Sequence, residues 1–181
     1  TSVESVLVHF SATSGGALST GNITGATTYT VDSTKTSDTA YNLVSLVDGA
    51  VVTLGGATAI NNNDVNTVLI DTVAGASLSL VLNDDQSGSN TAQGDITITD
   101  AASLAISQGS TETSVFDDLA LDNADTTALS ITGGNSLAIA MGAVTSSDAL
   151  TSLTLTSAAS SAVSMGAMAD GDSLTSLVVT A

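Results

Sequence analysis

An internal repeat constrains the fold of this 181-residue chain more than any other feature. Residues 129–156 align without gaps with residues 153–180, a shift of 24 positions, so that "DALTSLTLT" lies over "DSLTSLVVT". The alignment pairs Asp148 with Asp172 and Leu153 with Leu177. A period of this size is typical of architectures in which one structural unit stacks on the next. The sequence therefore predicts a stack of similar coils.

Weaker echoes of the repeat extend toward the N-terminus. "YNLVSL" and "VNTVLI" begin 24 residues apart, at Tyr41 and Val65. The run "ITIT" (96–99) precedes "LAIS" (104–107) by the same eight residues that separate "LSIT" (129–132) from "LAIA" (137–140). We expect these runs to occupy equivalent places in successive units.

The repeated runs have the periodicity of strands. Ile96 and Ile98 alternate with Thr97 and Thr99, a period of two rather than 3.6. Ser, Thr, Val and Gly are also poor helix formers. The Ala-rich "SAASSAVSMGAMA" could be read as a helix, but its counterpart one unit earlier opens with two glycines. The pattern thus predicts an all-β protein.

Short strands leave exposed edges, and stacking in parallel coils removes those edges. We therefore expect a parallel β-solenoid (β-helix) with coils of about 24 residues, forming a single repetitive domain over residues 1–181. Seven or eight such coils would span roughly 35 Å at the usual strand spacing. A β-sandwich is the alternative, but the ungapped repeat and the absence of proline argue against it. Both ends of the sequence fall within strand-like runs, so we expect an excerpt or a processed part of a longer surface protein.

The charge excludes several classes of partner. The chain has 18 acidic residues against one Lys, a formal net charge of −17, yet 43% of its residues are apolar. That apolar content is enough for folding, whereas 2% aromatic residues predict a thin core. With one cationic side chain, neither nucleic acid nor an anionic membrane is expected as a direct partner. Divalent cations, which prefer oxygen ligands, are expected instead.

Several features resemble the β-solenoid portion of secreted bacterial surface-layer (S-layer) proteins related to RTX-type exported proteins. They are "VESVLV" (3–8), the repeated "SLTL" and "SLVV" runs, and the bias toward Thr, Ser, Ala, Gly and Asp with almost no Lys, Arg, Cys or Pro. The resemblance implies an extracellular, cell-surface protein that folds with calcium and self-associates into a lattice. It also implies that another region anchors the protein to cell-surface polysaccharide. The glycine-rich G-G-x-G-x-D motif of the family is missing: "GGNSLAIA" at Gly133 lacks its third Gly and its Asp.

Clusters of aspartates are the candidate Ca²⁺ ligands. Calcium takes six to eight oxygens from carboxylates and loop carbonyls. Acidic residues in turns can also simply be solvated turn formers. The candidates lie in "NDDQSGSN", "FDDLALDNAD" and "DGD": Asp84, Asp85, Asp117, Asp118, Asp122, Asp125, Asp170 and Asp172.

Catalysis has few candidate groups. His9 is the single imidazole, Cys is absent, and four aromatic residues are available to stack on a sugar. We therefore expect no enzymatic activity. Pairs of outward hydroxyls could form a flat ice-binding array, but the pattern decays at Ala120 and Asp122. The pairs are Thr97 with Thr99, Ser130 with Thr132, and Thr154 with Thr156.

These observations favour a structural extracellular protein, part of a surface layer or of a self-assembling lattice or filament that Ca²⁺ stabilises. An adhesin or biofilm-matrix stalk, which would act as a spacer domain, is the alternative. Ice binding and action on polysaccharides rank below both.

Overall fold

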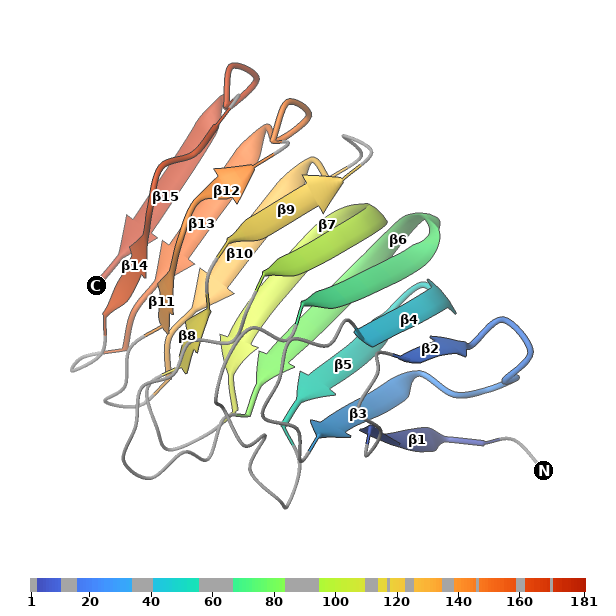
Figure 1. Ribbon diagram of the computed structural model, residues 1–181. Coiled ribbons are helices and arrows are strands. Elements are labelled where there is room, and N and C mark those ends of the chain that lie inside the picture. Colours follow the sequence, from blue (N-terminus) through green and yellow to red (C-terminus); the bar gives the residue numbers. More distant parts are fainter. Residues whose placement is uncertain are drawn as a thin grey trace.

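The computed structural model shows an all-β stack of coils (Figure 1). All strand pairings among the described residues are parallel, and successive coils are about 25 residues apart. The predicted β-solenoid and its coil length of about 24 residues are confirmed, and the β-sandwich alternative is wrong. The structure describes residues 3–10, 16–33, 41–55, 67–83, 95–109, 114–116, 118–122, 126–134, 139–145, 147–158, 162–169 and 171–181.

The longest row of paired strands, here called the first ladder, runs the length of the stack. Its register moves by 23 residues from Ser5 to Thr28, by 28 from Val51 to Ser79 and by 24 from Thr154 to Val178. In spatial order its strands are β1 (Ser5–Phe10), β3 (Thr28–Ser33), β5 (Ala50–Leu54), β6 (Val68–Leu82), β7 (Ile96–Gln108), β10 (Ala128–Thr132), β13 (Ser152–Thr156) and β15 (Ser176–Thr180).

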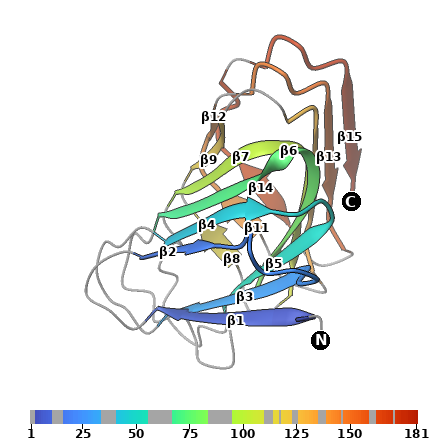
Figure 2. The ribbon, with the colours of Figure 1, turned by 90° about the vertical axis from the view of Figure 1, so that its right-hand side faces the viewer.

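A second ladder lies behind the first (Figures 1 and 2). It contains β2 (Gly16–Ser19), β4 (Tyr41–Leu46), the N-terminal parts of β6 and β7, β9 (Leu119–Asp122) and β12 (Val144–Thr145). Toward the C-terminus a three-stranded sheet closes the coils. Its strands are β8 (Ser114–Phe116), β11 (Ile139–Met141) and β14 (Val163–Met165).

Strands β6 and β7 belong to both ladders because each bends sharply near its middle. Gly75 lies in the bend of β6 with φ +79°, and Asp100 in the bend of β7 with φ +65°. Gly takes this left-handed conformation at no steric cost, and Asp tolerates it better than most residues. These two residues let one continuous strand turn the corner of the coil.

Columns of like apolar residues form the core. In the first ladder Leu104, Leu129 and Leu153 follow one another in register, each 2% exposed. In the second ladder Ile70, Ile98 and Leu121 do the same. Burying a side chain of this size contributes roughly 1.5–3 kcal/mol. Small residues suffice at the corners, where Ala76 and Ala101 are buried. The core is therefore narrow, as the low aromatic content predicts.

The register confirms the C-terminal repeat and corrects its upstream echoes. Leu153 pairs with Leu177, and Met141 with Met165. Tyr41, however, pairs with Val68 rather than Val65. "ITIT" lies in the second ladder and "LSIT" in the first, where it pairs with "LAIS". Strands of both ladders share the same alternation, so the pattern alone could not tell them apart.

Hydroxyl groups inside the stack bond from coil to coil. The buried polar residues among those described are Thr20, Thr72, Thr126 and Ser147. Each hydroxyl donates to a backbone carbonyl of an adjacent coil, as Thr126 Oγ1 does to Ala101 O at 2.7 Å. A buried hydroxyl without such a partner would cost about 1–3 kcal/mol. These bonds therefore let polar residues occupy the interior.

Candidate functional sites at acidic corners and open coil ends

Three of the eight predicted calcium ligands can be placed. Asp118 precedes β9, Asp122 ends β9, and Asp172 lies in the turn before β15. The other five fall outside the described residues: Asp84, Asp85, Asp117, Asp125 and Asp170. The structure therefore bears on part of the predicted set.

Asp118 takes part in a chain of hydrogen bonds between coils. Its Oδ1 accepts a bond from the backbone N–H of Ala143, one coil further on, at 2.7 Å. Its own N–H donates to Oδ1 of Asp95, one coil back, at 3.2 Å. Carboxylates that bond backbone N–H groups in this way stabilise a turn without a cation. Asp118 thus has a structural role whether or not it also binds calcium.

Asp118 and Asp122 cannot bind one ion together. They lie at opposite ends of the short strand β9, four residues apart. At 3.3 Å per residue their backbones are about 13 Å apart. Two ligands of one Ca²⁺ at about 2.4 Å place their oxygens within about 5 Å of each other. Asp side chains are too short to close that gap, so these two residues belong to different places on the surface.

Asp172 has a counterpart directly one coil back. The turn that carries it closes with Leu174 N bonded to Gly171 O at 3.1 Å, and the turn of Asp148 closes with Leu150 N bonded to Ser147 O at 2.9 Å. The strands that follow pair in register. Asp148 and Asp172 are therefore exposed, equivalent residues on neighbouring coils, about one strand spacing of 4.8 Å apart.

The geometry fits calcium only in part. Within the described part of the chain, no group of three or more His, Cys, Asp or Glu side chains is placed to hold a metal ion. Asp148 and Asp172 together supply at most four carboxylate oxygens, fewer than the six to eight that Ca²⁺ takes. Such a pair can attract a cation that keeps much of its water, but it forms no closed site.

Further aspartates, absent from the predicted set, also bond to backbone. Asp48 Oδ1 accepts from Ser77 N at 2.8 Å, and Asp71 Oδ2 accepts from Ser45 N at 3.1 Å. Ser45 has a left-handed φ of +64°. The sequence does hold a signal for one such bond, since Asp95 and Asp118 are 23 residues apart and each directly precedes a buried strand residue.

The repeated "LTSL" has its own explanation in a column of threonines at one corner. Thr151 Oγ1 donates to Thr127 O at 3.0 Å, and Thr175 Oγ1 donates to Thr151 O at 3.1 Å. The backbone N–H groups of Thr151 and Thr175 donate to the same carbonyls. Each Thr in this column, here called the threonine column, fastens its coil to the previous one twice.

The predicted hydroxyl pairs do not form one array. Thr97 and Thr99 lie in the second ladder, where they pair with Ala120 and Asp122. Ser130 with Thr132 and Thr154 with Thr156 lie in the first ladder instead. The threonine pairs are thus divided between two sheets.

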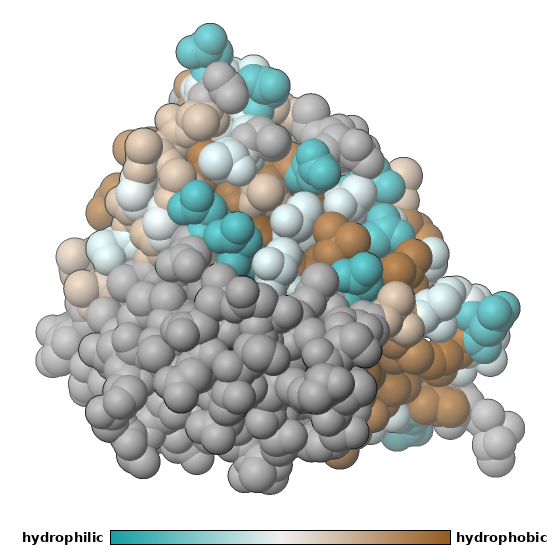
Figure 3. Space-filling model, viewed as in Figure 1, coloured by the Kyte–Doolittle hydropathy of each residue, from teal (hydrophilic) through white to brown (hydrophobic). Residues whose placement is uncertain are grey.

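The two ends of the first ladder expose apolar residues. On β15, Leu177 is 59% and Val179 65% exposed, although the residues one coil back belong to the core. A groove of about 280 Å³ opens there, lined by Leu155, Val163 and Val179 among others. On β1, Leu7 is 69% exposed. Figure 3 shows apolar surface over the N-terminal strands. Both ends of the stack therefore carry apolar surface beside a free strand edge.

Comparisons with known proteins give no match to a family model, to a curated protein or to a solved structure. No helix in the described part of the chain is long and apolar enough to cross a membrane.

Proposed function

We propose that this chain is a structural, extracellular β-solenoid whose role is ordered self-association, as in a surface layer or a filament. The observation that carries the proposal is the end of the stack at β15. Leu177 and Val179 continue columns whose inner members are buried, and a further coil would bury them as β15 itself buries Leu153. The extracellular location rests on the resemblance to S-layer proteins.

Stacking between copies would use the bonds that already hold the coils together. An exposed strand edge offers a row of unpaired N–H and C=O groups to another chain. Among the described residues, β15 pairs with β13 alone and β1 with β3 alone. The β1 strand of a second copy can present Val6 and Val8, which are partly buried against the core, to the apolar residues of β15.

Calcium has a supporting role in this proposal. Copies with a formal charge of −17 repel one another, and the repulsion opposes association. Divalent cations at exposed pairs such as Asp148 and Asp172 reduce that charge. Calcium would thus promote assembly by neutralising the coil corners as well as through any site in the loops.

The alternative function is a stalk in an adhesin or a biofilm matrix, in which the stack separates other domains. A stalk stays monomeric when calcium is added, whereas an assembling protein forms regular filaments or sheets. Electron microscopy and light scattering, with and without Ca²⁺, distinguish the two.

A pair of valines provides the matched variants. Val179→Lys places a charge on the open apolar end, while Val73→Lys places the same charge at a corner where Val73 is 44% exposed. Val179→Lys is expected to abolish filaments and Val73→Lys to leave them intact. Equal loss in both variants would assign assembly to net charge instead. A wild-type protein that stays monomeric in calcium would refute the proposal.

A further inference from the structure

One side of the stack carries no charged residue over six strands. Side chains alternate inward and outward along each strand, and every outward residue here is Ser, Thr, Ala or Val. We call this surface the uncharged face. It consists of the outward residues of 50–54, 77–82, 103–107, 128–132, 152–156 and 176–180.

The charge of the molecule lies elsewhere. The second ladder has Asp71 and Asp122 among its outward residues, and Asp95 and Asp118 stand at its edge. Asp148 and Asp172 lie in turns at the border of the uncharged face, where water surrounds them. With a formal charge of −17 on 181 residues, a face without charge across six strands is an uneven distribution.

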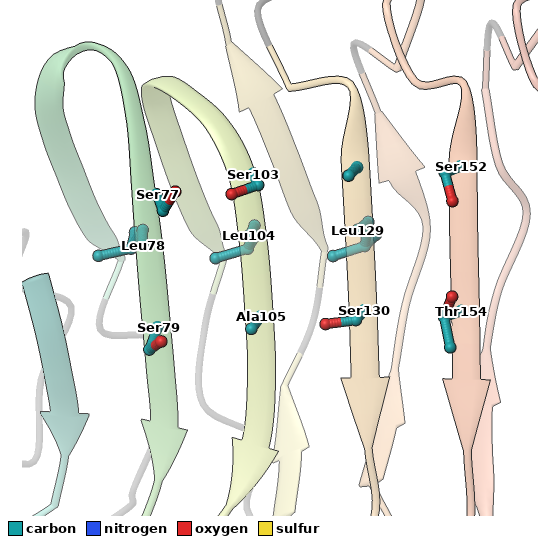
Figure 4. A pocket seen from close by; sticks show the side chains of 11 residues that line it. Ser77, Leu78, Ser79, Ser103, Leu104, Ala105, Leu129, Ser130, Ser152 and Thr154 are labelled. Carbon is teal, nitrogen blue, oxygen red and sulfur yellow. The ribbon is translucent and has the colours of Figure 1, made fainter. Parts of the chain in front are cut away.

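The uncharged face is also shaped for close contact. Ser79, Ala105, Ser130 and Thr154 follow one another across four neighbouring strands (Figure 4). These strands line a shallow groove of about 220 Å³. Short side chains let another sheet approach closely, and hydroxyls can bond across a contact.

A second copy of this chain fits the face better than any charged partner. Two copies that meet here bring no carboxylates together, and the opposite sheet lies about 10 Å behind, beyond the 8 Å Debye length at physiological salt. Rows of side chains on both copies repeat at the same 4.8 Å, so ridges and grooves match. Six strands of five residues cover roughly 450 Å² per copy, or about 900 Å² in total, close to the lower limit for a specific interface.

We propose that the uncharged face is a lateral contact between two copies of this chain. The inference deepens the proposed function: end-to-end stacking extends a filament, and this face joins neighbouring filaments. The small area makes the contact weak for an isolated pair and effective when repeated along an array.

Single cysteines test the contact directly, because the chain has none of its own. Ala105→Cys lies on the uncharged face, and Ala120→Cys is an outward alanine on the second ladder. Both full-length variants are oxidised or treated with a short bismaleimide over a range of concentrations, after circular dichroism has verified the fold. We expect at least fivefold more cross-linked dimer from Ala105→Cys, with a yield that rises with salt as the repulsion of like charges is screened. Equal yields from the two variants would overturn the lateral contact.

A background variant separates this inference from the proposed function. In Val179→Lys protein, which should not stack end to end, Ala105→Cys is expected to cross-link as before. Filaments in the wild type without selective cross-linking would refute the lateral contact alone. Selective cross-linking without filaments would support the lateral contact while refuting end-to-end stacking.

Discussion

Thr151 is fastened to Thr127 of the previous coil by two bonds, one from its backbone N–H and one from its Oγ1, each 3.0 Å long. Thr175 repeats the arrangement on Thr151. The arrangement places the side chain beside a carbonyl that already accepts a backbone bond, so the hydroxyl adds to the ladder instead of competing with it. The conserved spacing of "LTSL" within the chain therefore has a physical cause.

Replacing Thr151 by Val removes the side-chain bond and keeps the shape. We expect Thr151→Val to lower the free energy of unfolding by about 0.5–1 kcal/mol, the lower part of the range for a hydrogen bond because this corner is exposed. Urea unfolding measures the loss. Thr154→Val, on the outward side of β13, is the control and should change stability by less than about 0.5 kcal/mol. Equal losses in the two variants would contradict a role for the threonine column.

The leucine column offers a comparison at one position of successive coils. Leu129→Ala opens a cavity in the buried core and is expected to cost about 2–5 kcal/mol. Leu177→Ala, in the same column at the exposed end, is expected to cost less than about 0.5 kcal/mol in dilute protein. Chemical denaturation at low concentration measures both. A large cost at Leu177 under these conditions would show that another copy already covers the end.

Asp118 allows its hydrogen bond to be separated from its charge. Asp118→Ala leaves the N–H of Ala143 without its carboxylate acceptor and is expected to cost about 1 kcal/mol. Asp118→Asn keeps an acceptor oxygen and should lose less than half as much. Thermal or urea unfolding in EDTA makes the comparison. If the Asn variant loses as much as the Ala variant, the charge rather than the backbone bond is what matters.

Asp148 tests the cation hypothesis through a change of sign. In EDTA, Asp148→Asn removes repulsion with Asp172 and should raise the melting temperature slightly, because exposed charge pairs contribute within about 1 kcal/mol. In millimolar Ca²⁺ the same variant should melt below the wild type, since the bridging pair is lost. Matched NaCl controls for ionic strength. A wild-type melting curve that is identical in EDTA and in excess calcium would reject the hypothesis.

Gly166 is expected to tolerate no larger residue. A Cβ added there would lie 2.9 Å from backbone atoms of Gly142 in the previous coil. Backbone cannot move aside as a flexible side chain can, so Gly166→Ala should destabilise the protein by about 1–3 kcal/mol. Gly21→Ala, whose Cβ would meet its nearest neighbour at an ordinary 3.6 Å, is the control. Similar unfolding curves for the two variants would contradict the close packing of the coils.

The parts of the fold that repeat without gaps could be predicted, and those beside loops of changing length could not. Leu153 and Leu177 were assigned to the same column because nothing between them varies in length. Tyr41 was matched three residues too early, since its partner is Val68 and the coil there is longer. Period-two alternation states that a strand is half buried, but it does not state in which sheet the strand lies.

The candidate ligands illustrate a second limit. A pair of neighbouring aspartates in a sequence indicates acidity, whereas binding depends on which oxygens converge. Asp118 faces a backbone N–H of the next coil, and Asp122 lies at the far end of the same strand. The stack of Asp148 on Asp172 was predicted because both lie at the same point of a gapless repeat.

The register of the first ladder also bears on how such a protein can change in length. Its steps vary from 23 to 28 residues while every strand keeps its inward and outward sides. Extra residues are therefore absorbed between strands, and the duplication of one whole coil adds about 4.8 Å of height without disturbing any column. Genetic gain or loss of a unit thus works as a graduated scale, by which selection can set the reach of the protein in fixed increments.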